Sequence, residues 1–244
     1  MERARRARTD EIDEIPVAQR ILKLKSISSK KITFIKVLLF FSFLITFLSS
    51  SFVFKRYLSS NKDIVQVSKI LKNESLLGHL KYDEISKEDL ANLYPGFQVH
   101  KDTLSALRKM REAAASDGVF LVFLSGYRSI SLQNEIFYEN KSIRNQIAIE
   151  RARVSAPPGY SEHSTGYAID IGDRDRPETD FEISFENTPS FQWLKNNAAK
   201  YHFILSFPKN NLQNVSYEPW HWRYEGTVEA LRKFEAANKL RSSN

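Results

Sequence analysis

The sequence predicts an α+β domain that follows an N-terminal hydrophobic segment. Three observations lead to this prediction: an uncharged apolar run over residues 37–54, helical three-and-four spacing in several later segments, and short apolar runs that fit single strands. The helices and strands do not alternate regularly, which favours α+β over α/β. A chain of 244 residues allows one ordinary domain with such an appendage.

The apolar run over residues 37–54 has the length of a transmembrane helix. At about 1.5 Å per residue it would extend for about 27 Å, enough to cross a bilayer. Most of the nearby Lys and Arg precede the run in residues 1–36, whereas only Lys55 and Arg56 follow it closely. Because positive flanks stay in the cytoplasm, we expect a basic cytoplasmic arm over residues 1–36 and a single-pass anchor over residues 37–54.

This topology places the rest of the chain on the periplasmic or extracellular side of the cytoplasmic membrane. We expect a juxtamembrane spacer over residues 55–78 and the folded domain over residues 79–244. A cleaved signal peptide is the alternative, but the arm is long and no A-x-A-like site follows the apolar run, which favours an uncleaved anchor.

The net charge of +7 does not indicate a nucleic-acid partner. Residues 1–56 contain twelve Lys and Arg against five Asp and Glu, which accounts for the whole excess. The other 24 basic and 24 acidic residues cancel, so the domain is neutral by count. The chain has no cysteine, which excludes disulfides and thiol catalysis.

The domain contains recognisable helices and short strands. Residues 79–96 lack a clear period, so we expect loops and one short strand there. Apolar residues from Leu104 to Ala114 follow helical spacing, with Asp102 placed to cap the helix and Asp117-Gly118 to end it. The remaining expected elements are a strand over Val119–Leu124, helices over Ser131–Glu139 (Leu132, Ile136 and Phe137 inward), Ile143–Val154, Thr188–Ala199 and Thr227–Lys239, and strands over Phe203–Phe207 and Tyr217–Tyr224.

Two segments have the spacing of a metal site. Ser161 to Asp170 reads SEHSTGYAID, and Glu218 to His221 reads EPWH. A catalytic zinc takes three protein ligands and keeps an open position, so two His and one carboxylate would bind and a second carboxylate would serve as base. If residues 166–172 form a strand, Asp170 points away from the apolar side chains beside it, because side chains alternate. His163 precedes Asp170 by seven residues and Glu218 precedes His221 by three, and side chains at odd offsets point to opposite faces of a strand. The backbone must therefore bend near Gly166 and near Pro219 for each pair to meet.

These segments, together with SGYRS at Ser125–Ser129, resemble the zinc D-alanyl-D-alanine carboxypeptidases of the VanY type. That family has the pattern S-x-H-x-x-G-x-A-x-D followed by E-x-x-H, and the resemblance covers about residues 80–239. It implies the compact fold shared by DD-peptidases and Hedgehog signalling domains. It also implies a single domain that hydrolyses the terminal D-alanine of peptidoglycan stem peptides.

The resemblance implies a role for each of the motif residues. His163, Asp170 and His221 would hold Zn²⁺, and Glu218 would act as the general base. Arg128, in the SGYRS segment, would stabilise the negative charge that develops on the peptide carbonyl. The expected substrate contacts are Ser161, Gln133 and Arg128.

Other functions of the same fold remain open from the sequence. An L,D-carboxypeptidase or a cross-link endopeptidase would use identical metal ligands, and a peptidoglycan-binding module would keep the fold without catalysis. Serine-type penicillin-binding chemistry is disfavoured because the chain has no K-T-G motif. The sequence does not determine the oligomeric state.

Overall fold

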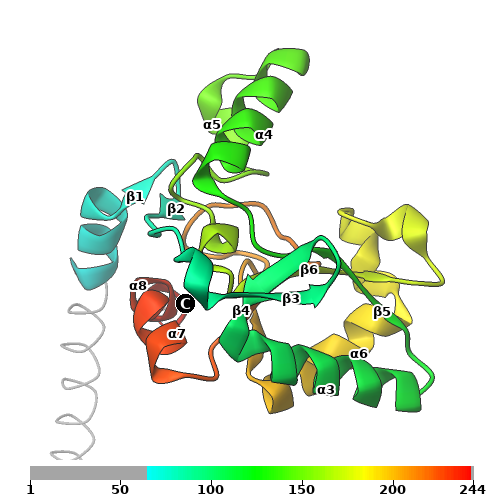
Figure 1. Cartoon of the computed structure of the whole chain (residues 1–244). Helices are drawn as coiled ribbons and strands as arrows, with labels where there is room; N and C mark the ends of the chain where they lie inside the picture. Colours follow the sequence, from blue (N-terminus) through cyan, green and yellow to red (C-terminus); the bar gives the residue numbers. More distant parts are fainter. Residues whose placement is uncertain (1–64, 243–244) are drawn as a thin grey trace, which may run out of the picture. The chain divides into compact units, whose positions relative to one another are not determined.

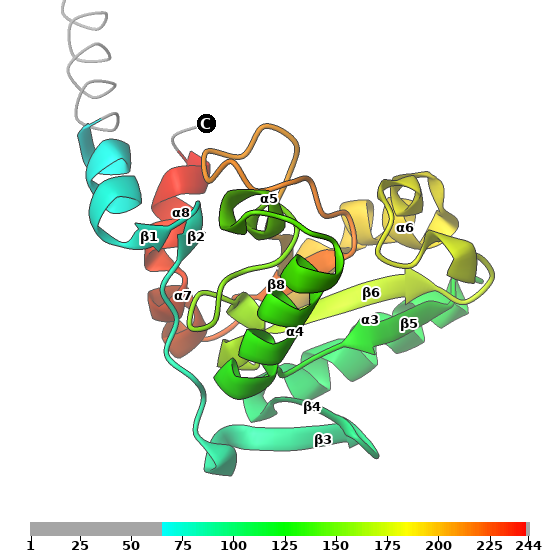
Figure 2. The ribbon, with the colours of Figure 1, turned by 90° about the horizontal axis from the view of Figure 1, so that it is seen from above.

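A computed structural model of the chain describes residues 65–242. At its centre lies a four-stranded antiparallel sheet with the strand order β5-β6-β8-β7. Helix α3 packs beside β5, whereas α4 and α5 lie on the opposite side of the sheet (Figures 1 and 2). The bounds of the sheet strands are Leu121–Ser125 for β5, Ala168–Asp173 for β6, His221–Tyr224 for β8 and Phe203–Leu205 for β7.

Strand β6 contributes to the hydrophobic core and also carries Asp170, one of the predicted metal ligands. All of its residues are buried, and Ile169 and Ile171 belong to the hydrophobic core. Asp170 lies in register with His221 on β8 and with Ser125 on β5. The antiparallel register therefore brings one residue from each of three distant sequence segments to the same row of the sheet.

Helix α3, Leu104–Ser116, confirms the expected apolar face, because Leu107, Met110 and Ala114 are buried. The prediction that Asp102 caps this helix was wrong. Asp102 lies in a preceding 3-10 turn, and its backbone N–H donates to the His100 ring at 3.1 Å. The ring therefore caps this 3-10 turn, whereas α3 itself begins after Thr103 without a side-chain cap.

The second helical region differs in detail from expectation. Helix α4 covers Ile130–Ile143 and is capped by Ser129, whose hydroxyl accepts from the backbone N–H of Leu132 at 3.0 Å. Phe137 is buried as expected, but Leu132 is 46% exposed, so its inward placement was wrong. Within the second predicted helix, Ile143–Val154, only Ile143 at the end of α4 and Ala148–Ala152, α5, are α-helical.

The C-terminal half follows the predicted order with shorter elements. Helix α6, Pro189–Asn197, begins after Thr188, whose hydroxyl accepts from the Phe191 N–H at 3.2 Å. The last predicted helix is divided into α7, Val228–Lys233, and α8, Glu235–Ser242.

Most of the strands near the start of the domain differ from the loops and single short strand expected there. Residues 79–100 contain β2, His79–Leu80, and the antiparallel hairpin of β3, Leu90–Tyr94, with β4, Phe97–His100. Strand β1, Ser75–Leu76, pairs with β2. Residues 65–73 are helical, and Ile70 in this helix is buried in the core.

The predicted membrane anchor over residues 37–54 lies outside the described residues. Within residues 65–242, no helix has the length and apolar character needed to cross a bilayer.

Candidate metal centre

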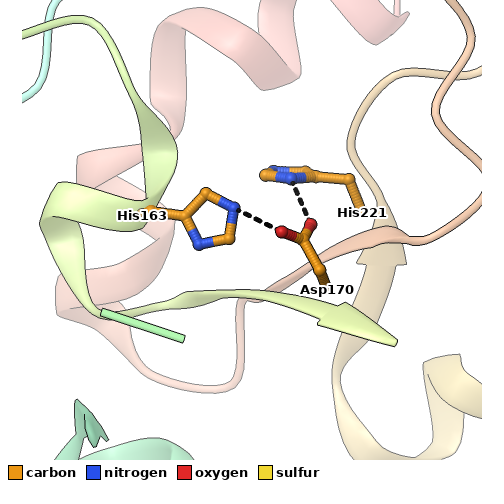
Figure 3. A group of neighbouring side chains, drawn as sticks. All are labelled: His163, Asp170 and His221. Atoms are coloured by element: carbon orange, nitrogen blue, oxygen red, sulfur yellow. Dashed lines mark hydrogen bonds and ion pairs between the residues drawn. The ribbon is translucent and has the colours of Figure 1, made fainter. Parts of the chain in front are cut away.

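The side chains of His163, Asp170 and His221 converge, although they come from separate parts of the chain (Figure 3). Nε2 of His163 lies 3.2 Å from one oxygen of Asp170, and Nδ1 of His221 lies 3.1 Å from the other. One ligand atom of each residue lies within 4.8 Å of the others, and all three side chains are buried. Two imidazoles and a carboxylate at this separation form a donor set that suits zinc.

Two backbone turns bring His163 and His221 to the same site as Asp170. His163 lies in a 3-10 turn over Glu162–Thr165 that ends at Gly166, which has a φ of 70°. A Cβ at Gly166 would lie 2.8 Å from the backbone nitrogen of His100, so a larger residue does not fit. On the other side of the site, the N–H of His221 donates to the Glu218 carbonyl at 3.1 Å across Pro219. Both predicted bends are confirmed.

Hydrogen bonds fix the orientation of both imidazoles. Nδ1 of His163 lies 2.7 Å from the Gly126 carbonyl oxygen, which can only accept, so this nitrogen carries the proton. The lone pair of the other nitrogen then faces Asp170. Nε2 of His221 lies 3.0 Å from a carboxylate oxygen of Glu162, which leaves Nδ1 facing Asp170. Partners on the far side of ligating imidazoles are typical of metal sites, so the residues present fit a divalent cation.

The electrostatics support the same conclusion. Burial lowers the pKa of His221, but its hydrogen bonds to Asp170 and Glu162 outweigh burial and raise the pKa to about 10. Burial raises the pKa of Asp170, yet His163 and His221 hold it below its usual range. In the protein alone, a proton on His221 therefore compensates two buried carboxylates, and a bound cation can take over that function.

Glu162 is a functional residue that the sequence analysis missed. It is buried, and besides His221 it accepts hydrogen bonds from Arg223 at 2.9 Å and from Ser206 at 2.5 Å. Arg223, on β8, forms ion pairs with Glu162 and with Glu225. The available signal was strand parity, which places Arg223 on the same face as His221 and therefore calls for a buried acid nearby.

Glu218 lies beside the metal residues without joining their hydrogen bonds. Its Oε2 is 3.9 Å from Nδ1 of His221. Burial raises the pKa of Glu218 to about 8, against the opposing effect of His221. A divalent cation bound by the neighbouring ligands would oppose the effect of burial and favour the carboxylate form, which can accept a proton.

Arg128 reaches the site from the end of β5. Its guanidinium lies 3.7 Å from Asp170 and donates to Ser125 at 3.1 Å and to the side-chain oxygen of Gln133 at 2.8 Å. Gln133 is fully buried, and its amide nitrogen donates to the Ala156 carbonyl at 2.6 Å. The geometry thus gives Gln133 the task of orienting Arg128, and its direct contact with substrate stays a prediction.

A cavity of about 610 Å³ opens onto the metal residues. Ser161 lines it, but its hydroxyl also accepts from the backbone N–H of His163 at 3.3 Å, so it shapes the turn as well. Trp220 is half-buried and also lines the cavity.

Two histidines outside the metal centre, His79 and His100, have structural partners. Nε2 of His79 lies 2.6 Å from the Ala152 carbonyl oxygen. His100 lies near Asp102 and Glu229 in a second group whose spacing would accommodate a cation. However, the two ring nitrogens of His100 already contact the Asp102 N–H and the Tyr167 hydroxyl, so this group fits a metal less well.

Known proteins share this arrangement of sequence and fold. The chain is 39% identical over 136 residues to "Putative carboxypeptidase YodJ" of Bacillus subtilis, a match that covers 54% of this chain and 48% of that protein. The chain thus spans about half the length of the curated relatives it matches.

Two solved structures are similar over 66% of the chain. One is the LdcB LD-carboxypeptidase, with 33% identity, a TM-score of 0.53 and 78% of that chain covered. The other is a variant of the vancomycin resistance D,D-pentapeptidase VanY in complex with Zn(II), with 29% identity, a TM-score of 0.50 and 90% of that chain covered. Residues 96–227 match the family profile described as VanY, D-alanyl-D-alanine carboxypeptidase. This chain therefore belongs to the VanY family.

Proposed function

We propose that the protein is a zinc-dependent carboxypeptidase that removes the terminal D-alanine from peptidoglycan stem peptides ending in D-Ala-D-Ala. The observation that carries the proposal is the convergence of two oriented imidazoles and a carboxylate beside a buried acid, Glu218, in one cavity. Membership of the VanY family and the Zn(II) complex of a similar protein support zinc as the metal and D-Ala-D-Ala as the substrate.

His163, Asp170 and His221 would hold the zinc. When bound, zinc supplies Lewis acidity that activates water and polarises a carbonyl at neutral pH. Glu218 accepts the proton of the attacking water and passes it to the leaving amine of D-alanine. Arg128 donates to the oxygen that becomes negative during attack, and Gln133 holds the guanidinium in place for this contact.

Removal of D-alanine from a tetrapeptide, an L,D-carboxypeptidase reaction, is the second candidate. It is favoured by the 33% identity to the LdcB LD-carboxypeptidase. Both reactions need the same metal residues and the same base, so the walls of the cavity decide between them.

Incubation of the purified chain with defined muropeptides tests the proposal. With zinc, we expect mass spectrometry to detect loss of one alanine from a pentapeptide ending in D-Ala-D-Ala. Loss of alanine only from the tetrapeptide would favour the L,D reaction, and cleavage of cross-linked dimers would favour an endopeptidase. A chain that binds muropeptides and releases nothing would be a binding module.

We further propose that residues 37–54 anchor the enzyme and that its domain works outside the cytoplasmic membrane. The uncharged run and the basic arm before it support this placement. Protease added to intact spheroplasts should digest the domain and leave an epitope fused to the N-terminus protected. An intact domain that becomes sensitive only after lysis would contradict the proposed topology.

A further inference from the structure

Arg151 is a buried cation in the wall of the catalytic cavity, and it has no carboxylate partner in the part of the chain that the structure describes. It is 7% exposed, lies in α5 and lines the same cavity as the metal residues. Its Nε is buried and has no hydrogen-bond partner within residues 65–242. Among these described residues, no carboxylate lies within ion-pair distance of its guanidinium.

The other two arginines close to the metal centre are compensated by carboxylates. Arg223 pairs with Glu162 at 2.9 Å and Glu225 at 2.8 Å, and Arg128 faces Asp170 at 3.7 Å. Burial lowers the pKa of Arg151, and the neighbouring cation Arg144 lowers it further. Arg144 is exposed and also lines the cavity. The cavity therefore has a second positive region, which lacks the carboxylates that accompany Arg128.

We propose that Arg151, with Arg144 beside it, forms a subsite for a carboxylate of the peptide substrate. An unpaired buried charge is unfavourable, and an entering anion removes that cost. A guanidinium suits a carboxylate because it offers two parallel N–H donors. The carboxylate belongs either to the C-terminal D-alanine or to a residue further along the stem peptide. The inference rests on the proposed function, since that function supplies a peptide with both kinds of carboxylate.

The segment that carries Arg151 is fastened to the catalytic machinery. The carbonyl of Ala152, the next residue, is bonded by His79, and the carbonyl of Ala156 is bonded by Gln133 at 2.6 Å. Gln133 at the same time holds Arg128 at 2.8 Å. Helices α4 and α5 lie side by side in both views of the fold (Figures 1 and 2). These contacts fix the separation between Arg151 and Arg128. Both can therefore act as contact points for one bound peptide.

Equilibrium binding to the full-length chain tests the subsite. Calorimetry would compare three pentapeptides: one with all carboxylates free, one amidated at its C-terminus and one amidated at its internal carboxylates. The protein would carry Glu218→Gln, which prevents turnover, with or without Arg151→Gln. We expect Arg151→Gln to weaken binding of the free peptide about 10- to 100-fold, the range of a charge-assisted hydrogen-bond pair. The amidated peptide that no longer responds to Arg151→Gln identifies the carboxylate.

Arg153→Gln is the matched control, because Arg153 is an exposed arginine two residues away that does not line the cavity. The thermal midpoint of Arg151→Gln should not fall, since the substitution removes an uncompensated buried charge. The subsite is refuted if Arg151→Gln leaves binding of all three peptides unchanged, weakens all three equally, or if none of them binds. Binding that depends on Arg151 while the parent enzyme releases no alanine would retain the subsite and reject the proposed reaction.

Discussion

Oε2 of Glu162 lies 3.0 Å from Nε2 of His221, on the side of the imidazole opposite to Asp170. Arg223 and Ser206 hold this carboxylate in turn, so the imidazole is fixed by a network of buried groups. Such partners raise the basicity of a ligating imidazole and set which nitrogen faces the metal. Glu162 is therefore part of the metal centre although it supplies no ligand atom.

Replacement of Glu162 by Gln should weaken zinc binding about 10- to 100-fold, the usual effect of losing such a partner. The measurement is competition for zinc against a chromophoric chelator. Glu225→Gln is the control, because Glu225 contacts Arg223 and the structure gives it no contact with His221. Equal zinc affinity in Glu162→Gln and the parent chain would show that the carboxylate does not support the ligand.

Glu218→Gln should abolish most of the alanine release and leave zinc bound. The amide cannot accept the proton of the attacking water, and loss of a general base costs about 100- to 10,000-fold in rate. Zinc content should stay unchanged, since Glu218 lies 3.9 Å from the nearest ring nitrogen of a ligand. Retention of the parent rate would exclude Glu218 as the base.

Gln133 and Arg128 should behave as one unit in a double-mutant cycle. Arg128→Ala removes the donor to the developing negative charge and should lower kcat about 100- to 1,000-fold. Gln133→Ala should lower kcat less, because it only frees the guanidinium, and adding it to Arg128→Ala should cause little further loss. Asn134→Ala on the exposed side of α4 is the control. Additive effects of the two substitutions would assign Gln133 an independent role.

Acid should destabilise the zinc-free chain partly through His79. Burial lowers the pKa of His79 below its ordinary value of 6.5, so near that pH the unfolded chain binds a proton that the folded chain does not. The contribution of the neutral imidazole is therefore complete above about pH 6.5 and decreases as the pH falls below it, by at most about 1.4 kcal/mol per pH unit.

Urea unfolding at about pH 7.5 and about pH 5.5 measures this dependence. In His79→Gln the free energy of unfolding should change less between the two conditions than in the parent chain. His202→Asn is the control, because His202 is exposed and asparagine tolerates its φ of 64°. An identical pH dependence in His79→Gln and the parent chain would assign the acid sensitivity to other groups.

Residues with strong local signals were predictable from the sequence. Strand parity placed Asp170 away from the core side chains Ile169 and Ile171, and the structure confirms that placement. The bend at Gly166 was predictable because the odd offset between His163 and Asp170 requires a bend and glycine marks such positions. The Thr188 cap followed from a threonine directly before proline.

Features that depend on distant contacts were not predictable. Gln133 reads as exposed helix surface, and its burial becomes clear only when Arg128 and Ala156 are both in place around it. The buried pair of Glu162 and Arg223 joins residues 61 positions apart. The β3–β4 hairpin lacks a clear period because its strands are short and β3 is only partly buried.

Zinc content per chain tests the central claim most directly. Full-length protein dialysed against trace zinc should retain about one zinc per chain, as expected for a site with three protein ligands. His163→Gln, Asp170→Asn and His221→Gln should each lose most of that zinc while keeping the thermal unfolding transition of a folded domain. A parent chain that holds no zinc, or three variants that each keep a full equivalent, would contradict the assignment of these residues as the metal centre.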